Sequence, residues 1–298
     1  MKTFAIICAI LLTASFKITA QEQIDLYQGN IPNSKKSHIQ ETSGGFIKGV
    51  TIPKLEIYLP EKDKANGCAI IVVPGGGYSG LTYQGEGVRP AKELAKNGIA
   101  AFVLKYRLPL DSTMINKNIG PLQDAQQALK IIRENASKYG IDPARVGIMG
   151  SSAGGHIASI IATRSEETFI ENKEGTNLRP DFFILIYPVT SMQDNLTHID
   201  SRNALLGKNP SKDIIDKFSG ELQVTEKTPP AYITHAGDDR LVDVDNSIVF
   251  YESMRHKKVP AELHLYPKGG HGFYFSKPTE EWMSPLLLWM KNSKFINK

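Results

Sequence analysis

From about residue 49 onward, short continuous hydrophobic runs alternate with longer amphipathic stretches. Continuous apolar runs of roughly four to eight residues are typical of strands buried on both faces of a parallel sheet. The run at residues 49–58 instead alternates, which predicts an edge strand. Buried strands are predicted at residues 68–73, 99–104, 146–149, 182–187, 231–235 and 261–266.

Helical periodicity fills the intervals between these strands. Within residues 121–138, apolar side chains recur at the spacing of one face of a helix. Further helices are predicted at residues 88–96, 153–162, 248–256 and 280–295. Strands that alternate with helices favour an α/β fold, with a mostly parallel central sheet and helices on both of its faces.

Two segments are polar and lack a strong period. Residues 21–45 are predicted to wrap the surface. Residues 190–229 contain only short helical pieces, at 203–206 and 212–218, and predict a small polar cap. Because no internal repeat or low-complexity linker interrupts the chain, residues 21–298 are predicted to form a single domain.

The N-terminus has the pattern of a secretory signal peptide at residues 1–20. Lys2 precedes an apolar run at residues 4–13, and the sequence Ile-Thr-Ala at residues 18–20 offers a cleavage site. The apolar run is too short to span a bilayer. We therefore expect a secreted or periplasmic protein; the alternatives are a buried N-terminal strand and an uncleaved or lipid anchor.

Charge and cysteine content exclude several classes of protein. The net charge is +4, and removal of residues 1–20 takes away Lys2 and Lys17 and no acid, which leaves +2. That charge is too small and too scattered to indicate binding to nucleic acid or to a membrane surface. Only Cys68 remains beyond the leader, so no internal disulfide is possible, and Cys68 is predicted to be a small buried residue.

The most specific chemical signal is the sequence Gly-Ser-Ser-Ala-Gly at residues 150–154. A buried strand is predicted before it and a buried helix after it, which is the setting of the nucleophile turn in α/β-hydrolases. This turn is so tight that the positions two before and two after Ser152 must lack bulk. The pattern predicts Ser152 as a nucleophile whose hydroxyl points away from the sheet.

A serine nucleophile needs a base to take its proton and an acid to orient that base. His271 is the candidate base, because it lies in a glycine-rich loop after the last predicted strand. The acid is expected between the serine and the histidine in chain order. Asp238 and Asp239 both follow the strand at 231–235; the D-x-x-V spacing to Val242 favours Asp239, and Asp238 remains open.

The other histidines are expected to be structural or exposed. His156 lies one helical turn after Ser152 and is interpreted as a packing residue, with pocket lining as the alternative. Two lie in predicted strands and are expected to be structural: His235 and His264. Three lie in polar or helical settings typical of the surface: His38, His198 and His256.

An acyl-transfer site also needs donors for the oxyanion of its intermediate. Gly75, Gly76 and Gly77 directly follow the strand at 68–73, and glycine lets a backbone N–H approach a substrate closely. The predicted donors are the N–H groups of Gly76, Gly77 and Ala153. A flexible turn and a phosphate cradle are the alternatives, although no G-x-x-x-x-G-K-[ST] sequence is present.

Five motifs together carry a family resemblance. They are Val-Val-Pro-Gly-Gly-Gly-Tyr at 72–78, Phe-Val-Leu-Lys-Tyr-Arg-Leu at 102–108, Gly-Ser-Ser-Ala-Gly-Gly-His at 150–156, the stretch 235–247, and Gly-Gly-His-Gly-Phe at 269–273. In this order they resemble the secreted α/β-hydrolase esterases related to acetylxylan esterases, in the carboxylesterase and lipase superfamily. The resemblance covers about residues 55–289.

The resemblance implies an α/β-hydrolase fold with Ser152 as nucleophile, Asp239 as acid, His271 as base and residues 75–77 in the oxyanion hole. The chain departs from the family pattern at two positions. Pro74 stands where the lipase-like pattern has a histidine, which removes a side-chain hydrogen bond but leaves the backbone role of the loop. Asp243 stands where a proline usually follows the D-x-x-V sequence.

The resemblance also implies a secreted serine esterase that removes short acyl groups, acetyl above all, from plant polysaccharides such as xylan. It implies no metal or organic cofactor, and an acylated carbohydrate or small ester as substrate, with no nucleic acid or membrane as partner; the oligomeric state stays open. Tyr78, Glu86 and Arg107 are predicted to line the alcohol side of the pocket; the alternative is that each fixes a loop.

Three other functions compete with this prediction. A feruloyl or general carboxylesterase differs only in the acyl group. A prolyl-oligopeptidase-like peptidase is disfavoured, because the chain has no room for the large extra domain of such enzymes. A catalytically inactive carbohydrate-binding protein is disfavoured by the full set of serine, acid, histidine and glycine loop.

Overall fold

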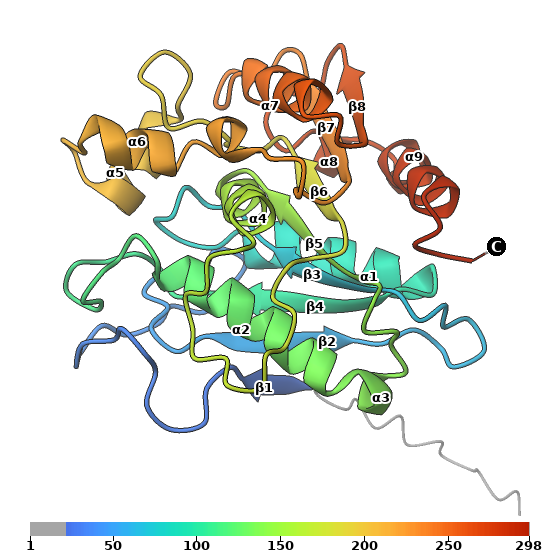
Figure 1. Cartoon of the computed structure of the whole chain (residues 1–298), viewed down its shortest axis with the longest axis horizontal. Coiled ribbons are helices and arrows are strands. Elements are labelled where there is room, and N and C mark those ends of the chain that lie inside the picture. The colour runs from blue at the N-terminus through green and yellow to red at the C-terminus, as the bar shows by residue number, and fades with distance from the viewer. Residues whose placement is uncertain (1–21, 298) are drawn as a thin grey trace, which may run out of the picture.

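The computed structural model describes residues 22–297, so the predicted leader at residues 1–20 lies outside the described part of the chain. An eight-stranded sheet forms its centre, in the order β1-β2-β4-β3-β5-β6-β7-β8 (Figure 1). β1 pairs antiparallel with β2, and β2 pairs antiparallel with β4. From β4 onward, in the order β4-β3-β5-β6-β7-β8, all neighbouring strands are parallel. The predicted mostly parallel sheet is confirmed. Its strands are β1 Gln23–Asp25, β2 Lys54–Tyr58, β3 Ala69–Val73, β4 Ala100–Lys105, β5 Val146–Ser151, β6 Phe183–Ile186, β7 Ala231–Ala236 and β8 Ala261–Tyr266.

The prediction of the sheet edge is wrong. The strand expected at the edge is β2, and it pairs with β4 on one side and with β1 on the other. β1 comes from the segment 21–45, which was expected only to wrap the surface. Three residues are too few to show an alternation, so the sequence pattern could not reveal this strand.

Helices cover both faces of the sheet because the chain changes direction along it. The chain moves one way from β3 through α1 (Arg89–Lys96) to β4, and back again through α2 (Gly120–Glu134) to β5. Right-handed crossovers in both connections put α1 and α2 on opposite faces. The helix α4 (Ala153–Thr163) packs beside α2.

The helix predicted at residues 121–138 is interrupted at Asn135, whose side chain donates to the Ile131 carbonyl oxygen at 2.8 Å. A short helix, α3 (Ala136–Tyr139), follows the break. The helices of the C-terminal part are α7 Asp245–His256, α8 Phe273–Ser276 and α9 Thr279–Asn292. The helices expected at 248–256 and 280–295 are therefore present, with ends shifted by a few residues.

The central strands are buried along their whole length, which explains why their sequences are continuously apolar. β3, β5, β6 and β7 have every residue buried. Cys68, just before β3, is also buried as predicted, and burial raises the pKa of its thiol to about 12. A thiol in this setting stays protonated and is a packing group.

The polar segment at residues 190–229 forms three short helices. These are α5 Ile199–Leu206, α6 Lys212–Lys217 and the 3₁₀ helix η2 Gly220–Gln223, so the two predicted helical pieces are confirmed. Figure 1 shows α5 and α6 standing apart from the sheet, at the upper left. In residues 22–297, no helix has both the length and the apolar character needed to cross a bilayer.

Candidate active site

Ser152 stands at the sharp turn between β5 and α4. Its backbone has φ 52° and ψ −121°, a strained conformation for a residue with a side chain. A Cβ at Gly150 would lie 2.1 Å from the Gly154 carbonyl oxygen, and one at Gly154 would lie 2.1 Å from the Val73 carbonyl oxygen. Both positions of the Gly-x-Ser-x-Gly sequence therefore exclude any larger residue, as the sequence predicts.

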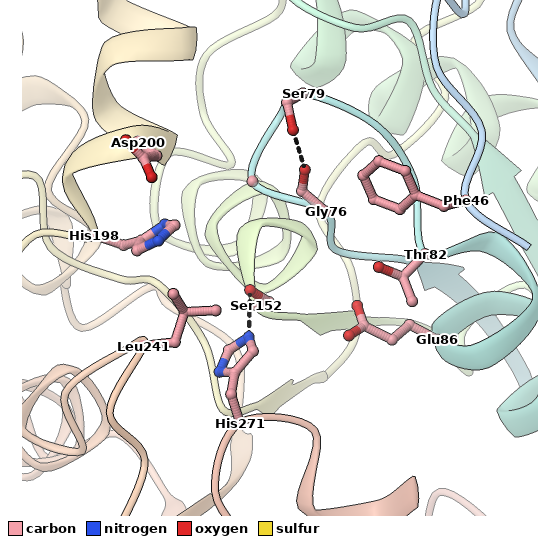
Figure 2. A pocket seen from close by; sticks show the side chains of 11 residues that line it. Phe46, Gly76, Ser79, Thr82, Glu86, Ser152, His198, Asp200, Leu241 and His271 are labelled. Carbon is pink, nitrogen blue, oxygen red and sulfur yellow. Dashed lines mark hydrogen bonds between the residues drawn. The ribbon is translucent and has the colours of Figure 1, made fainter. Parts of the chain in front are cut away.

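The structure brings Ser152, His271 and Asp239 together in one hydrogen-bonded chain (Figure 2 shows the first two). The Ser152 Oγ atom lies 2.9 Å from His271 Nε2. On the other side of the ring, His271 Nδ1 lies 2.7 Å from Asp239 Oδ2. This is the arrangement in which an imidazole can take the serine proton while a carboxylate fixes its tautomer.

Asp238 has a different partner from its neighbour Asp239. Its Oδ1 atom accepts the Gly270 N–H at 2.8 Å, which ties the histidine loop to the turn after β7. Gly270 has φ 64° and Gly272 has φ 79°, so the loop bends through conformations that favour glycine. Of the two aspartates that the sequence left open, only Asp239 contacts the imidazole of His271.

The Asp239 carboxylate is held by several donors besides His271. Its Oδ1 atom accepts the Leu241 and Val242 N–H groups at 2.9 and 3.0 Å. Its Oδ2 atom lies 3.1 Å from His235 Nε2. Burial alone raises the pKa of this carboxyl, but the bonds to His235 and His271 outweigh burial and hold the pKa well below its ordinary value.

His235, at the end of β7, is a hydrogen-bond partner of Asp239. The sequence did not assign it this role. The ring is fully buried, and its Nδ1 atom lies 2.8 Å from Ser247 Oγ. The expected structural role thus takes a specific form, because the ring positions the Asp239 carboxylate. The only signal in the sequence is that His235 precedes Asp239 by four residues across one tight turn.

The predicted oxyanion groups surround Ser152. Ala153 is the first residue of α4, so its N–H has no partner inside the helix. Among residues 22–297, no backbone acceptor is recorded for the N–H groups of Gly76 and Gly77. Gly75 differs, because its N–H donates to Glu86 Oε2 at 2.6 Å. Within residues 22–297, the N–H groups of Gly76, Gly77 and Ala153 thus have no acceptor in the protein, whereas that of Gly75 has one.

Glu86 holds the glycine loop against the nucleophile turn. A Cβ at Gly75 would lie 2.5 Å from Glu86 Oε2 and 2.7 Å from the Cβ of Ser152, so the loop approaches the serine very closely. Tyr187 donates to the second Glu86 oxygen at 3.3 Å. Burial raises the pKa of the Glu86 carboxyl, against the opposing effect of the Gly75 N–H. Glu86 lines the pocket as predicted and also fixes a loop.

Ser152 and His271 open into a cavity of about 510 Å³. Figure 2 shows His198 and Asp200 on one side of these two residues, and Phe46, Thr82 and Glu86 on the other. Six lining residues were not predicted from the sequence: Phe46, Ser79, Thr82, His198, Asp200 and Leu241. Of these, His198 corrects the expectation of a surface histidine, because packing of the cap brings it into the cavity.

Two of the predicted pocket residues do not line the pocket. The Tyr78 side chain is buried, and its hydroxyl lies 2.7 Å from His156 Nδ1. His156 Nε2 in turn lies 2.8 Å from the Phe218 carbonyl oxygen, so His156 has the expected packing role. Burial lowers the pKa of His156 to about 4.

Arg107 is the second correction, because it is buried in an ion pair with Asp124 away from the cavity. The Nη2 atom of Arg107 lies 2.7 Å from Asp124 Oδ1, and both side chains are almost fully buried. Its Nη1 atom donates to the Pro32 carbonyl oxygen at 2.7 Å and to Ser34 Oγ at 3.0 Å. Arg107 therefore fixes the N-terminal segment to the fold, which is the alternative role considered for it.

Residues 55–254, about two thirds of the chain, match the BD-FAE family. The chain belongs to this family. Its BD-FAE region contains Ser152 and Asp239 but ends before His271. Residues 217–293, which include His271, also match the dienelactone hydrolase family.

This BD-FAE chain is similar to two bacterial relatives that are considerably longer. An acetylxylan esterase of Xylanibacter ruminicola is 41% identical over 79% of this chain and 47% of that protein. An endo-1,4-beta-xylanase B of Butyrivibrio fibrisolvens is 39% identical over 78% of this chain and 35% of that protein. The chain thus matches about half of one relative and a third of the other.

Solved structures confirm the α/β-hydrolase type of fold. An acetyl ester-xyloside bifunctional hydrolase from Caldicellulosiruptor lactoaceticus superimposes with a TM-score of 0.77 at 32% identity, over 95% of this chain and all of that one. An esterase from Thermogutta terrifontis superimposes with a TM-score of 0.68 at 23% identity, over 82% of this chain and 89% of that one.

Proposed function

We propose that this BD-FAE protein is a serine hydrolase of carboxylic esters, with Ser152 as nucleophile, His271 as general base and Asp239 as the orienting acid. The observation that carries the proposal is the unbroken hydrogen-bonded chain from the Ser152 hydroxyl to the Asp239 carboxylate. The serine end of this chain lies in an open cavity, where the N–H groups of Gly76, Gly77 and Ala153 can donate hydrogen bonds to an oxyanion. The esterase names of the relatives support the same reaction class.

In the proposed reaction, Ser152 Oγ attacks the ester carbonyl carbon while His271 Nε2 takes its proton. The carbonyl oxygen becomes an oxyanion and accepts hydrogen bonds from Ala153 and the glycine loop; each such donor contributes roughly 3–4 kcal/mol to the transition state. The bond to the alcohol breaks, and the alcohol leaves with the proton from His271. Water, deprotonated by His271, then attacks the acyl carbon; the bond to Ser152 Oγ breaks, His271 returns the proton to that oxygen, and the acid is released.

For the substrate we propose short acyl groups, acetyl above all, on xylan or xylo-oligosaccharides. Two relatives are an acetylxylan esterase and a xylanase, and a similar solved structure is an acetyl ester-xyloside hydrolase. We also propose that residues 1–20 direct export and that residues 21–298 act as one catalytic domain outside the cytoplasm, where such polymers are met. The signal-peptide pattern of the sequence supports this location.

The reaction class is tested with p-nitrophenyl acetate and the variant Ser152→Ala. Loss of a triad member lowers the rate by roughly 10⁴-fold or more in serine hydrolases. The variant removes only one oxygen atom, so circular dichroism should show an unchanged fold. Equal rates for the wild type and Ser152→Ala would contradict the proposal.

The acyl group is tested separately, with acetylated xylan and methyl ferulate as competing substrates. We expect a higher kcat/KM for the acetyl ester. A clear preference for ferulate would overturn the acetyl assignment and leave the serine esterase mechanism intact, because both esters react through the same steps.

A further inference from the structure

His198 enters the cavity from the cap, outside the catalytic chain. It precedes α5 and lines the cavity together with Asp200. A Cβ at Gly77 would lie 4.0 Å from His198 Cε1, so the ring packs against the glycine loop that carries the oxyanion donors. The ring therefore lies within reach of the groups attached to an ester bound at Ser152 (Figure 2).

The hydrogen bonds of His198 leave one ring nitrogen for a ligand. Its Nδ1 atom lies 2.8 Å from Ser201 Oγ, and Ser201 is fully buried. Because no other acceptor for the Ser201 hydroxyl is recorded among residues 22–297, this hydroxyl donates to Nδ1. The ring proton then sits on Nε2, for which the described residues offer no partner. Partial burial also lowers the pKa of His198, so the ring is neutral at neutral pH.

The cavity thus has a hydrogen-bond donor and an acceptor on the side of the cap, and an aromatic face on the opposite side. The donor is His198 Nε2–H, and the acceptor is the Asp200 carboxylate two residues later. On the opposite side, Phe46 is 42% exposed and presents its ring to the cavity. Sugars have hydroxyl groups at their edges and C–H groups on their faces, and these two kinds of surface fit such walls. The ester of a simple alkyl or aryl alcohol has no further hydroxyl group that could bind the polar side.

We propose that His198 and Asp200 bind hydroxyl groups on the alcohol portion of the substrate, so that the cap selects esters of sugars over esters of simple alcohols. The inference rests on the proposed esterase function, because it assigns the residues that recognise the leaving alcohol of that reaction. It gives the polar cap a role in specificity and leaves the chemistry to Ser152, His271 and Asp239.

The test measures kcat/KM of His198→Ala and Asp200→Asn on acetylated xylo-oligosaccharides and on p-nitrophenyl acetate, whose alcohol carries no second hydroxyl. The readout is the ratio of the two values. Loss of a neutral hydrogen bond should lower this ratio about three- to tenfold, and loss of a charged acceptor about ten- to a hundredfold. The loss should fall on KM for the oligosaccharide, because the contact is made in the bound substrate as well as in the transition state.

Matched controls come from the surface of the same protein. His256→Ala and Asp213→Asn change exposed residues outside the cavity and should leave the ratio at the wild-type value. Free xylo-oligosaccharide should also inhibit the hydrolysis of p-nitrophenyl acetate. The inhibition should be stronger for the wild type than for His198→Ala.

Two results would overturn the inference. One is that both cap variants keep the wild-type kcat/KM on both substrates. The other is a proportional loss on both substrates, which would show that the cap residues only support the fold. Either result differs from failure of the proposed function, in which the wild type itself would hydrolyse neither ester faster than Ser152→Ala does.

Discussion

Asp239 and Asp124 are both buried carboxylates that face a basic side chain, but their hydrogen bonds lead to different places. Asp239 is hydrogen-bonded to His271, and His271 is hydrogen-bonded to Ser152, which lines the cavity. The Asp124 carboxylate accepts hydrogen bonds from the guanidinium and the backbone N–H of Arg107, and from the Tyr27 hydroxyl. Neither Arg107 nor Tyr27 lines this cavity.

The comparison shows that burial and pairing do not by themselves mark a functional residue. Both carboxylates are surrounded by donors, as buried charges must be. The difference lies in the far end of each set of hydrogen bonds. At Asp239 the far end is Ser152, the proposed nucleophile, which lines the cavity. At Asp124 the far end is the carbonyl oxygen of Pro32 and the hydroxyl of Ser34.

The largest expected effect is that of Asp239→Asn on catalysis. An amide at this position no longer stabilises the imidazolium form of His271, and it favours the wrong tautomer of that ring. The corresponding change in serine hydrolases lowers kcat by about 10⁴-fold. Steady-state kinetics with p-nitrophenyl acetate measures the loss.

Asp238→Asn is the matched control, because an amide oxygen can still accept the Gly270 N–H. We expect its kcat to stay within about threefold of the wild type. A larger loss at Asp238 than at Asp239 would reverse the assignment of the acid.

The next effect concerns stability and is expected at Arg107. Arg107→Met leaves the Asp124 charge buried without its partner, which typically costs about 3–5 kcal/mol of unfolding free energy. Urea denaturation measures this loss, and the kcat of the folded variant should change little. If activity fell strongly while stability stayed constant, Arg107 would be a substrate residue after all.

A double variant separates charge from packing at this site. Asp124→Leu combined with Arg107→Met removes both charges and should recover part of the stability that Arg107→Met loses. No recovery would mean that the bonds of Arg107 to Pro32 and Ser34 matter more than its pairing with Asp124.

The same contrast explains what the sequence could predict. The nucleophile turn is local, because Gly150, Ser152 and Gly154 meet within one strand–turn–helix unit, and steric exclusion at two glycines leaves a clear pattern. The buried parallel strands were predicted from continuous apolar runs, whereas their order in the sheet was not predicted. Asp239 and His271, which the structure places in one hydrogen-bonded chain with Ser152, could be proposed from the sequence because the acid and the base follow the serine in a fixed order in this fold.

Residues whose roles depend on distant packing were predicted less well. Tyr78 directly follows the glycine loop and Arg107 lies just after β4, and nothing local shows that their partners are His156 and Asp124. His198 was expected on the surface, since its cavity position depends on how the cap packs against Gly77. Spacing along the chain does not encode such long-range contacts.

The smallest expected effect concerns His156 and extends the comparison to two histidines. His156 and His271 each have both ring nitrogens paired, but His156 is fully buried between Tyr78 and Phe218. Burial lowers the pKa of His156 from 6.5 to about 4. Between these two values the unfolded chain binds a proton that the folded chain does not, so stability falls as the pH falls through this window.

His156→Gln tests this prediction, because glutamine can keep one acceptor and one donor but does not titrate. From pH 6.5 down to about 4, the wild type should lose on the order of 2–3 kcal/mol more unfolding free energy than the variant. Denaturation curves at several pH values measure the difference, which cancels the carboxylates common to both proteins. Parallel curves would mean that the ring of His156 gains its proton without loss of stability, and would contradict the prediction.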